Sequence, residues 1–386
     1  MDIAPGSPIK LGGLLALSGF EAPQGIDGTR AAELALEDWD RQILGHPIIL
    51  LSEDTGCSEG GGATAALKLV ADPDLVAILA VSCSSAAVPA AKIMSEAGLT
   101  MISGDNTLPS LTSVAGVRGA DSQAGYFRTI HNDVDQGRAA ASFAFQELGV
   151  RKVATIDADD PYTQGLAQVF ARVFTELGGE VVLATAVNKG DENMEPVLTA
   201  VANSQAELVF FPIFHPEAGY VVTQAQQVPA LDDVTLMGAE IQLRPDFIEA
   251  VGPAGIGLFL VGPATPTGEA YDDLVARYKA KYGEPPIGTY HAQSYDATHL
   301  LLSAIAATAS QDEDGTLHVH RQALRDWLYA VEDFDGLTGR LSCDAFGDCG
   351  AARFNVVLFE DPRAGLEGLT SNVVYSFGEN EDRPGS

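Results

Sequence analysis

Hydroxyl, amide and carboxylate side chains follow two apolar, strand-like runs in the first third of this chain, at residues 76–81 and 100–103. In an open parallel sheet, ligands bind outside the carboxyl ends of the strands. Hydroxyl groups there, and the N–H groups of a helix N-terminus, can hold a carboxylate. The candidate residues are Ser84, Asp105, Asn106 and Thr107. The structural alternatives are a helix N-cap at Ser84 and an ordinary turn at 104–107.

A second group of candidates follows later strand-like runs, at 152–156, 208–212 and 235–238. Its members are Tyr162, Phe214 and Glu240. A carboxylate at the mouth of a strand, opposite an anion site, suits an ammonium group, whereas a lone glutamate is usually solvated. The two groups together describe a site for a zwitterion, with donors on one domain and a carboxylate with aromatic rings on the other.

The cysteines form no CxxC pair and have no histidine cluster nearby, so no zinc site is expected. They are Cys57, Cys83, Cys343 and Cys349. Free buried thiols are the alternative, but the spacing favours two local disulfide bridges. The first two cysteines each follow a strand-like run, so neighbouring parallel strands would bring them together, and closing that loop would contribute roughly 3 kcal/mol. The last two bracket a turn-like insert. Bridges would imply an oxidising compartment.

Strand-like runs that alternate with amphipathic helical stretches indicate βαβ units and parallel sheets. The alternation occurs in two blocks. The first block has strands at 9–15, 48–51, 76–81 and 100–103 and helices at 25–44, 63–70 and 86–97. The second has strands at 126–130, 152–156, 180–184, 208–212 and 235–238 and helices at 135–148, 164–177, 194–202 and 217–227. The sequence therefore predicts an α/β fold with two doubly wound parallel-sheet domains.

The remaining segments are expected to complete these two sheets rather than to form a third domain. They comprise a strand at 257–261, helices at 271–281, 294–307 and 321–331, and a hairpin of 337–342 with 352–360. The first domain is then expected to cover 1–121 and 256–333, and the second to cover 128–248 and 340–386. The chain would cross between them near 121–128, 248–256 and 333–340. Such a three-segment hinge would let two lobes close around a ligand.

The net charge is strongly negative, because 53 Asp and Glu residues outweigh 22 Lys and Arg residues and give −31 at pH 7. Phosphate backbones and anionic lipid repel such a chain, so nucleic acid and charged membrane surfaces are poor partners. No run approaches the roughly 18 consecutive apolar residues of a membrane span. No signal peptide opens the sequence, and we expect one to have been removed.

An ordered set of short segments resembles the leucine/isoleucine/valine-binding protein family, which are type I periplasmic substrate-binding proteins of ABC importers. These segments run through nearly the whole chain in the family's order. They are Cys57 and residues 10–19, 83–85, 98–103, 107–112, 162–165, 216–217, 237–240 and 337–341. The resemblance implies a periplasmic binding protein type I fold, in which two lobes close on a small ligand.

The resemblance also implies roles for individual residues. The family's ligand serine falls on Ser84 and its ligand threonine on Thr107. Its first site tyrosine falls on Tyr162, and its ammonium-binding glutamate falls on Glu240. The hydroxyl pair would therefore hold a carboxylate, and the glutamate would hold an ammonium group.

Three features depart from the family's pattern. Phe214 stands where the family has a second tyrosine, so one hydroxyl is lost. Asp105 and Asn106 replace small residues before the ligand threonine. The family's bridge falls on the first two cysteines, and the pair at 343 and 349 is an addition. The first two departures imply a ligand side chain different from that of leucine.

The implied function is that of an extracytoplasmic solute-binding protein, in the periplasm or at the extracellular surface. It would capture an amino acid or a close analogue and deliver it to an ABC importer. The expected partners are the small-molecule ligand and the transporter permease, and we expect a monomer with no cofactor and no metal. One alternative keeps the fold but changes the role, to a ligand-sensing receptor or an amide- or urea-binding protein of the same superfamily.

An α/β enzyme is the main competing class. The chain has no GxGxxG after its first strand, no Walker A sequence and no GxSxG elbow. His318 and His320 could chelate a metal ion, but two histidines alone are a weak signal and favour a solvent-exposed turn. No nucleophile–base pair stands out, so no catalytic residue is assigned.

Overall fold

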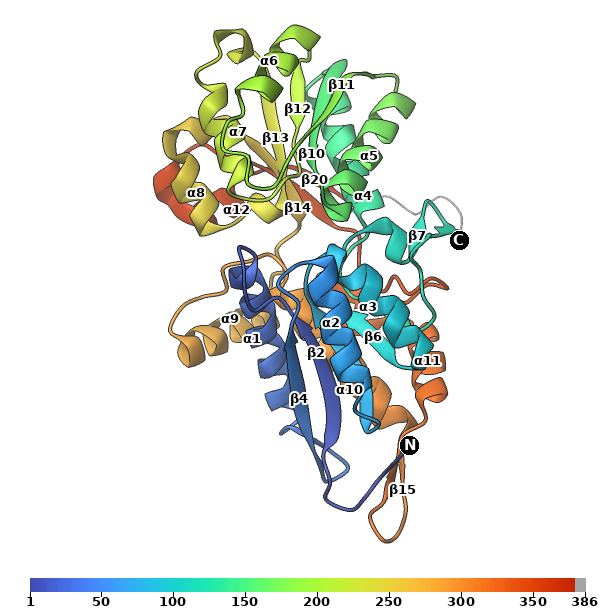
Figure 1. The fold of residues 1–386 in the computed structure, drawn as a ribbon. Helices are drawn as coiled ribbons and strands as arrows, with labels where there is room; N and C mark the ends of the chain where they lie inside the picture. The colour runs from blue at the N-terminus through green and yellow to red at the C-terminus, as the bar shows by residue number, and fades with distance from the viewer. Residues whose placement is uncertain (379–386) are drawn as a thin grey trace. The chain divides into compact units, whose positions relative to one another are not determined.

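The computed structural model describes residues 1–378 and divides into two compact units (Figure 1). Unit 1 consists of Met1–Asn132 and Pro266–Ala351. Unit 2 consists of Asp133–Thr265 and the described part of Ala352–Ser386. The chain therefore passes between the units three times.

Each of these passages lies later in the chain than the expected ranges at 121–128, 248–256 and 333–340. Strand pairing explains the differences. The segment at 126–128 completes the sheet of unit 1, and the strand at 259–263 belongs to the sheet of unit 2. Residues 343–349 pair with unit 1 and not with unit 2. Of the expected second domain, residues 379–386 lie outside the described part of the chain.

Unit 1 is built around a six-stranded sheet of order β3-β4-β2-β5-β6-β9. The strands of unit 1, in this sheet and in three smaller ones, are β1 (Asp2–Ile3), β2 (Ile9–Leu15), β3 (Gln42–Ile43), β4 (His46–Asp54), β5 (Leu75–Val81), β6 (Thr100–Ser103), β7 (Ser113–Val114), β8 (Val117–Arg118), β9 (Tyr126–Arg128), β15 (Ser310–Gln311), β16 (Leu317–His318), β17 (Phe334–Gly336) and β18 (Gly339–Leu341). Its helices are α1 (Ala22–Asp38), α2 (Glu59–Val70), α3 (Ser84–Glu96), α9 (Glu269–Tyr282), α10 (His291–Thr308) and α11 (Arg321–Tyr329), with a 3-10 turn η1 (Pro109–Leu111). All neighbours in this sheet are parallel except β3 and β4.

Two apolar clusters cover the two faces of this sheet. One cluster joins the sheet to α1, α10 and α11, and the other joins it to α2 and α3. Every residue of β5 is buried, because helices cover the central strand on both faces. Because β5 and β6 are parallel neighbours, their carboxyl ends lie at the same edge of the sheet. The candidate residues of unit 1 come directly after these two strand ends.

Unit 2 is built around a seven-stranded sheet of order β11-β10-β12-β13-β14-β19-β20. Its strands are β10 (Lys152–Ala158), β11 (Glu180–Val187), β12 (Leu208–Phe210), β13 (Thr235–Ala239), β14 (Phe259–Pro263), β19 (Phe354–Leu358) and β20 (Val373–Phe377). Its helices are α4 (Asp133–Ser142), continued by the π-helical η2 (Phe143–Glu147), then α5 (Pro161–Glu176), α6 (Glu195–Ser204), α7 (Glu217–Ala225), α8 (Pro245–Val251) and α12 (Gly365–Ser371). Short 3-10 turns are η3 (Pro229–Leu231), η4 (Glu240–Gln242), η5 (Gly252–Gly255) and η6 (Pro362–Ala364).

The sheet of unit 2 is also covered on both faces. An apolar cluster joins one face to α6, α7, α8 and α12, and a second cluster joins the other face to α4 and α5. The strands from β11 to β14 are parallel, whereas β19 and β20 add antiparallel edges. The two doubly wound α/β units confirm the predicted fold class.

The expected hairpin of 337–342 with 352–360 is wrong. The first of these segments forms a small hairpin between β17 and β18. The second becomes β19, which pairs with β14 and β20 in the other unit. The cysteine pair lies between the two segments, and its loop pairs with β9 instead.

Both cysteine pairs are bridged, and the described chain has no free cysteine. Cys57–Cys83 links the loop after β4 to the start of α3 across 26 residues. Cys343–Cys349 closes a loop with a sequence separation of 6. The alternative of free buried thiols is not what the structure shows.

His318 lies in a small antiparallel sheet of order β1-β16-β15 and is flanked by two carboxylates. Its Nδ1 is 2.8 Å from Asp2 Oδ1, and its Nε2 is 2.9 Å from Asp312 Oδ2. The hydrogen bonds to Asp312 and Asp2 raise the pKa of His318 above its ordinary value. Among residues 1–378 no group of three or more His, Cys, Asp or Glu side chains could hold a metal ion. This histidine is therefore an ion-paired side chain of the fold.

We expect the contribution of His318 to stability to depend on pH. Because its folded-state pKa is raised, the contribution is complete below the unfolded-state pKa of about 6.5 and is lost as pH rises through the folded-state value. The difference in melting temperature between the wild type and His318→Gln should therefore shrink from about pH 5.5 to about pH 8.5. His320→Gln is the control, since His320 is exposed on the same segment. A difference that stays constant over this range would contradict the prediction.

Candidate functional site

The candidate residues of unit 1 come together on two loops at the carboxyl ends of β5 and β6. These strands are parallel neighbours, and Ala80 pairs with Ser103 near their ends. The Ser103 hydroxyl donates to the Ala80 carbonyl at 3.2 Å and accepts from the N–H groups of Asp105 and Asn106, both at 3.1 Å. One serine at a strand end thus shapes the start of the loop at 105–108.

The two loops of unit 1 are also tied directly to each other. The Asn106 side-chain amide donates to the Ser82 carbonyl, and the Leu108 N–H donates to the Ser84 hydroxyl at 3.3 Å. Asn106, Thr107 and Ser84 are buried, and Asp105 is half-buried. The structure therefore places the four predicted residues in one cluster, which we call half-site 1: Ser84, Asp105, Asn106 and Thr107.

Ser84 is not the N-cap of its helix. Cys83 occupies that position, with extended backbone and no side-chain hydrogen bond to the helix. Ser84 is the first helical residue, so the N–H groups of Ser84 and Ser85 have no acceptor within α3. The N-cap alternative is therefore wrong, and the segment combines hydroxyl groups with helix N-terminal N–H groups. Such a combination favours an anionic group.

Ser85 was not singled out from the sequence. Its Oγ is buried and has no hydrogen-bond partner within residues 1–378. Buried hydroxyls are nearly always hydrogen-bonded, so this one is a further candidate donor for a ligand. Its position directly after Ser84, in the first turn of α3, is the only signal that the sequence offered.

The candidate residues of unit 2 gather around the Glu240 carboxylate. Only 1% of Glu240 is exposed, so the alternative of a solvated surface glutamate is wrong. The Tyr162 hydroxyl donates to Glu240 Oε1 at 2.7 Å, and the Gln136 side-chain amide donates to Oε2. The Phe214 ring lies 5.6 Å from the Tyr162 ring. We call Tyr162, Phe214, Glu240 and Gln136 half-site 2.

Local structure fixes Tyr162 and Glu240 in half-site 2. Asp160 caps α5 by accepting from the Tyr162 N–H at 2.8 Å, which places the tyrosine in the first turn. Glu240 opens the 3-10 turn after β13. The Gln242 side chain holds this turn by donating to the carbonyls of Phe211 and Ile213, both at 2.9 Å. A helix cap thus positions Tyr162, and a turn at a strand end positions Glu240.

Tyr162 and Glu240 are both buried, and carboxylates lie near the tyrosine hydroxyl. Burial, followed by the neighbouring Glu240 and Asp133 charges, raises the pKa of Tyr162 well above its ordinary value. Tyr162 therefore remains a neutral donor. A buried carboxylate that accepts hydrogen bonds from a tyrosine hydroxyl and a glutamine amide is well matched by a cationic group on a ligand.

Gln136 was missed at the sequence level. It lies on α4, at the start of unit 2, and reaches Glu240 across 104 residues of sequence. Its amide also donates to the Val261 carbonyl at 3.2 Å. The only available signal was its place in the first helix after a strand end, which many surface residues share.

A family model described as periplasmic binding protein matches residues 8–349. The chain belongs to the periplasmic binding protein family. This is a family of extracytoplasmic solute-binding proteins and not of enzymes. Within residues 1–378, none of the helices has both the length and the apolar character that a membrane crossing requires.

Three relatives illustrate the similarity. An amino acid binding protein of Pseudomonas aeruginosa is 32% identical over 212 residues, a match that covers 54% of this chain and 55% of that protein. The crystal structure of a leucine binding protein from Thermotoga maritima has a TM-score of 0.80 and 24% identity, and covers 92% of this chain and 96% of its own. A solute-binding protein of R. palustris in complex with benzoate has a TM-score of 0.77 and 21% identity, and covers 96% of both chains. These solved structures support the fold.

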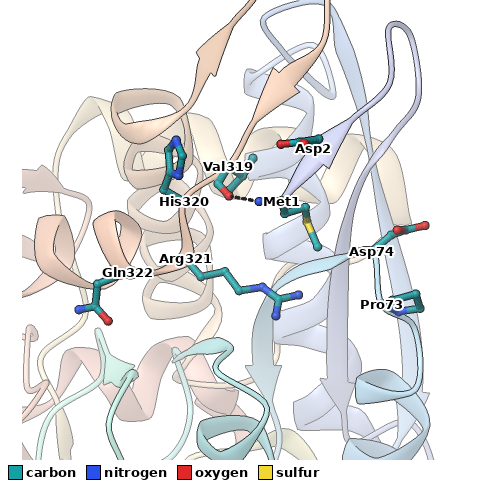
Figure 2. Close-up of a pocket in the computed structure, with 8 residues that line it drawn as sticks. All are labelled: Met1, Asp2, Pro73, Asp74, Val319, His320, Arg321 and Gln322. Carbon is teal, nitrogen blue, oxygen red and sulfur yellow. Dashed lines mark hydrogen bonds between the residues drawn. The ribbon is translucent and has the colours of Figure 1, made fainter.

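A separate surface hollow of about 530 Å³ lies in unit 1 (Figure 2), and no residue of half-site 1 lines it. It is lined by Met1, Asp2, Pro73, Asp74, Val319, His320, Arg321 and Gln322. Asp74 comes just before β5, whereas Ser84 follows the other end of that strand. In Figure 2 the chain's N-terminal amine donates to the Val319 carbonyl, at 3.0 Å. The hollow therefore lies at the amino end of the sheet, opposite to the edge where this fold binds solutes.

Proposed function

We propose that this periplasmic binding protein captures an L-amino acid or a close analogue and delivers it to an ABC importer. Half-site 1 supplies hydroxyl and N–H donors for the α-carboxylate, and half-site 2 supplies Glu240 for the α-ammonium. The permease of that importer is the protein partner, and the binding protein acts as a monomer. The two units act as ligand-binding lobes joined by the three chain passages.

The buried Glu240 is the single observation that carries this proposal. Its two oxygens already accept from Tyr162 and Gln136, so the carboxylate is held in one orientation before a ligand arrives. Burying a carboxylate costs free energy, and a cationic ligand group in contact with Glu240, which is 1% exposed, would offset that cost. A neutral amide or an aromatic carboxylate such as benzoate would bring no such charge. An amino acid carries both the carboxylate that half-site 1 favours and the ammonium group that half-site 2 favours.

The departures in half-sites 1 and 2 bear on the side chain of the ligand. Phe214 adds an apolar ring beside Tyr162, and the half-buried Asp105 adds a carboxylate beside Thr107. Asp105 would repel an anionic side chain and would accept from a polar one. We therefore favour a neutral or basic amino acid over an acidic one.

Thermal-shift measurements with a ligand panel test the proposal. The panel contains the twenty amino acids, small amides, urea and benzoate. A ligand at a hundredfold excess over its Kd should stabilise the protein by about 2.7 kcal/mol, and we expect the largest shifts from amino acids. The carboxylic acid analogue that lacks the α-amino group is the matched control and should give little shift. A best ligand without an amino group, or no shift in the whole panel, would overturn the proposal.

A further inference from the structure

The loop closed by Cys343–Cys349 lies along β9, at the edge of the sheet of unit 1. The Arg128 N–H donates to the Gly347 carbonyl, and the Cys349 N–H donates to the Arg128 carbonyl, both at 2.9 Å. These bonds make a parallel bridge between Arg128 and Asp348. The loop therefore continues the sheet beyond β9, its last strand. The backbone bridge to Arg128 fixes the position of Asp348 on this edge.

The loop itself has a fixed conformation. Its ends are joined by the disulfide, and Asp344 Oδ1 accepts from the N–H groups of Phe346 and Asp348 at 2.8 and 3.0 Å. Gly347 has a φ of +97°, and a Cβ there would collide with the Tyr126 carbonyl. Only glycine allows the loop to approach β9 so closely.

Asp348 is a hydrogen-bond acceptor for four side chains. Its Oδ1 accepts from Arg128 Nε at 2.5 Å and from the Thr112 hydroxyl at 2.9 Å. Its Oδ2 accepts from the Asn132 amide at 3.2 Å and from the Ser113 hydroxyl at 3.3 Å. The carboxylate is thus fully engaged, and it fixes the guanidinium plane of an arginine that has no exposed surface.

The same guanidinium also hydrogen-bonds to the loop at 105–108 of half-site 1. Arg128 Nη1 donates to the carbonyls of Asn106 and Leu108, both at 2.9 Å. These two carbonyls flank Thr107, the predicted ligand threonine. A guanidinium presents its donors in a rigid plane, so the orientation set by Asp348 is passed to both carbonyls. The chain of contacts runs from the disulfide loop through Asp348 and Arg128 to the ligand loop.

We propose that Asp348, held in place by the Cys343–Cys349 bridge, is a positioning residue that fixes the ligand loop of half-site 1 through Arg128. This proposal rests on the proposed function, because it takes the loop at 105–108 as part of the ligand site. It gives a role to the cysteine pair that is an addition to the family's pattern. It also explains why a buried arginine lies beneath a loop that carries hydroxyl and amide groups.

Hydrogen–deuterium exchange on the ligand-free protein is the primary test. Asp348→Asn removes the charge that orients Arg128, and we expect amide exchange at 105–112 to become about tenfold faster. The double variant Cys343→Ser/Cys349→Ser should accelerate the same segment. Asp348→Asn keeps the Cys343–Cys349 disulfide, so this variant alone tests the proposal if the double variant does not fold. Unchanged exchange at 105–112 in Asp348→Asn would overturn the proposal.

Asp296→Asn is the matched control. Asp296 is also a buried carboxylate of unit 1, and it accepts from the Leu337 and Thr338 N–H groups at 2.8 and 2.9 Å. Its loss should loosen residues 337–338 and leave exchange at 105–112 unchanged. General loosening of unit 1 would accelerate exchange at 105–112 in both variants, and that outcome would count against a positioning role.

Calorimetric titration with L-leucine supplies a second readout. If the wild type binds this probe, Asp348→Asn should weaken its affinity about tenfold, and Asp296→Asn should not. Equal affinity in Asp348→Asn and wild type would overturn the positioning role. If the wild type does not bind L-leucine, the exchange result still decides the role of Asp348. Failure of the proposed function is thereby distinguished from failure of this inference.

Discussion

Glu240→Gln is expected to weaken binding of the best amino acid ligand more than tenfold. The substitution keeps the size of the side chain and removes its charge, so the ligand ammonium loses a buried, charge-assisted partner. Such a hydrogen bond contributes about 1.5–3 kcal/mol, and the unpaired ammonium adds a desolvation cost. Isothermal titration of the wild type and the variant with the same ligand measures the change.

The ligand-free protein should respond very differently to Glu240→Gln. Its melting temperature should barely move, because removing a desolvated charge offsets the altered hydrogen bonds to Tyr162 and Gln136. Glu217→Gln is the matched control. Glu217 is another buried glutamate of unit 2, but it accepts from the Gly190 N–H at 2.5 Å, outside half-site 2. Unchanged affinity in Glu240→Gln would remove Glu240 from the site.

The sequence grouped those candidate residues that directly follow a strand. Ser84, Thr107 and Glu240 each come within a few residues of a carboxyl strand end, and parallel sheets gather such ends at one edge. Local rules therefore sufficed to group them. The alternatives for Ser84 and Glu240 failed because capping and burial depend on the exact start of a helix and on tertiary packing.

Residues that act through long-range contacts could not be predicted in the same way. Arg128 meets Asp348 across 220 residues of sequence, and Gln136 meets Glu240 across 104. Neither pair has a local pattern. The pairing of β19 with β14 was not predicted for a related reason. A two-residue hydrophobic period indicates a strand but does not indicate which strand pairs with it. The predicted hairpin around the last two cysteines was wrong because its two strands pair with other strands.

Phe170→Ala should have the largest effect on stability among the substitutions considered. The Phe170 ring stacks on Phe210, with centroids 4.4 Å apart, and on Phe174, at 5.8 Å. Phe170 has no exposed surface, so its truncation leaves a cavity between α5 and the sheet of unit 2. Deleting a buried phenylalanine ring typically costs about 3–5 kcal/mol. Differential scanning calorimetry should show a transition lowered by about 2–4 °C for each kcal/mol lost.

Phe170→Ala should also distinguish an effect on the stability of unit 2 from an effect on ligand binding at half-site 2. Phe170 and Tyr162 share α5 but are about 12 Å apart along the helix axis, so Tyr162 should keep its bond to Glu240 well below the melting transition. Ligand affinity at low temperature should therefore stay within about threefold of the wild type. Phe145→Ala is the control, since Phe145 is half-buried at the edge of the same aromatic group, 5.7 Å from Phe174. A loss of stability no larger than that of the control would show that the Phe170 stack does not hold α5 on the sheet.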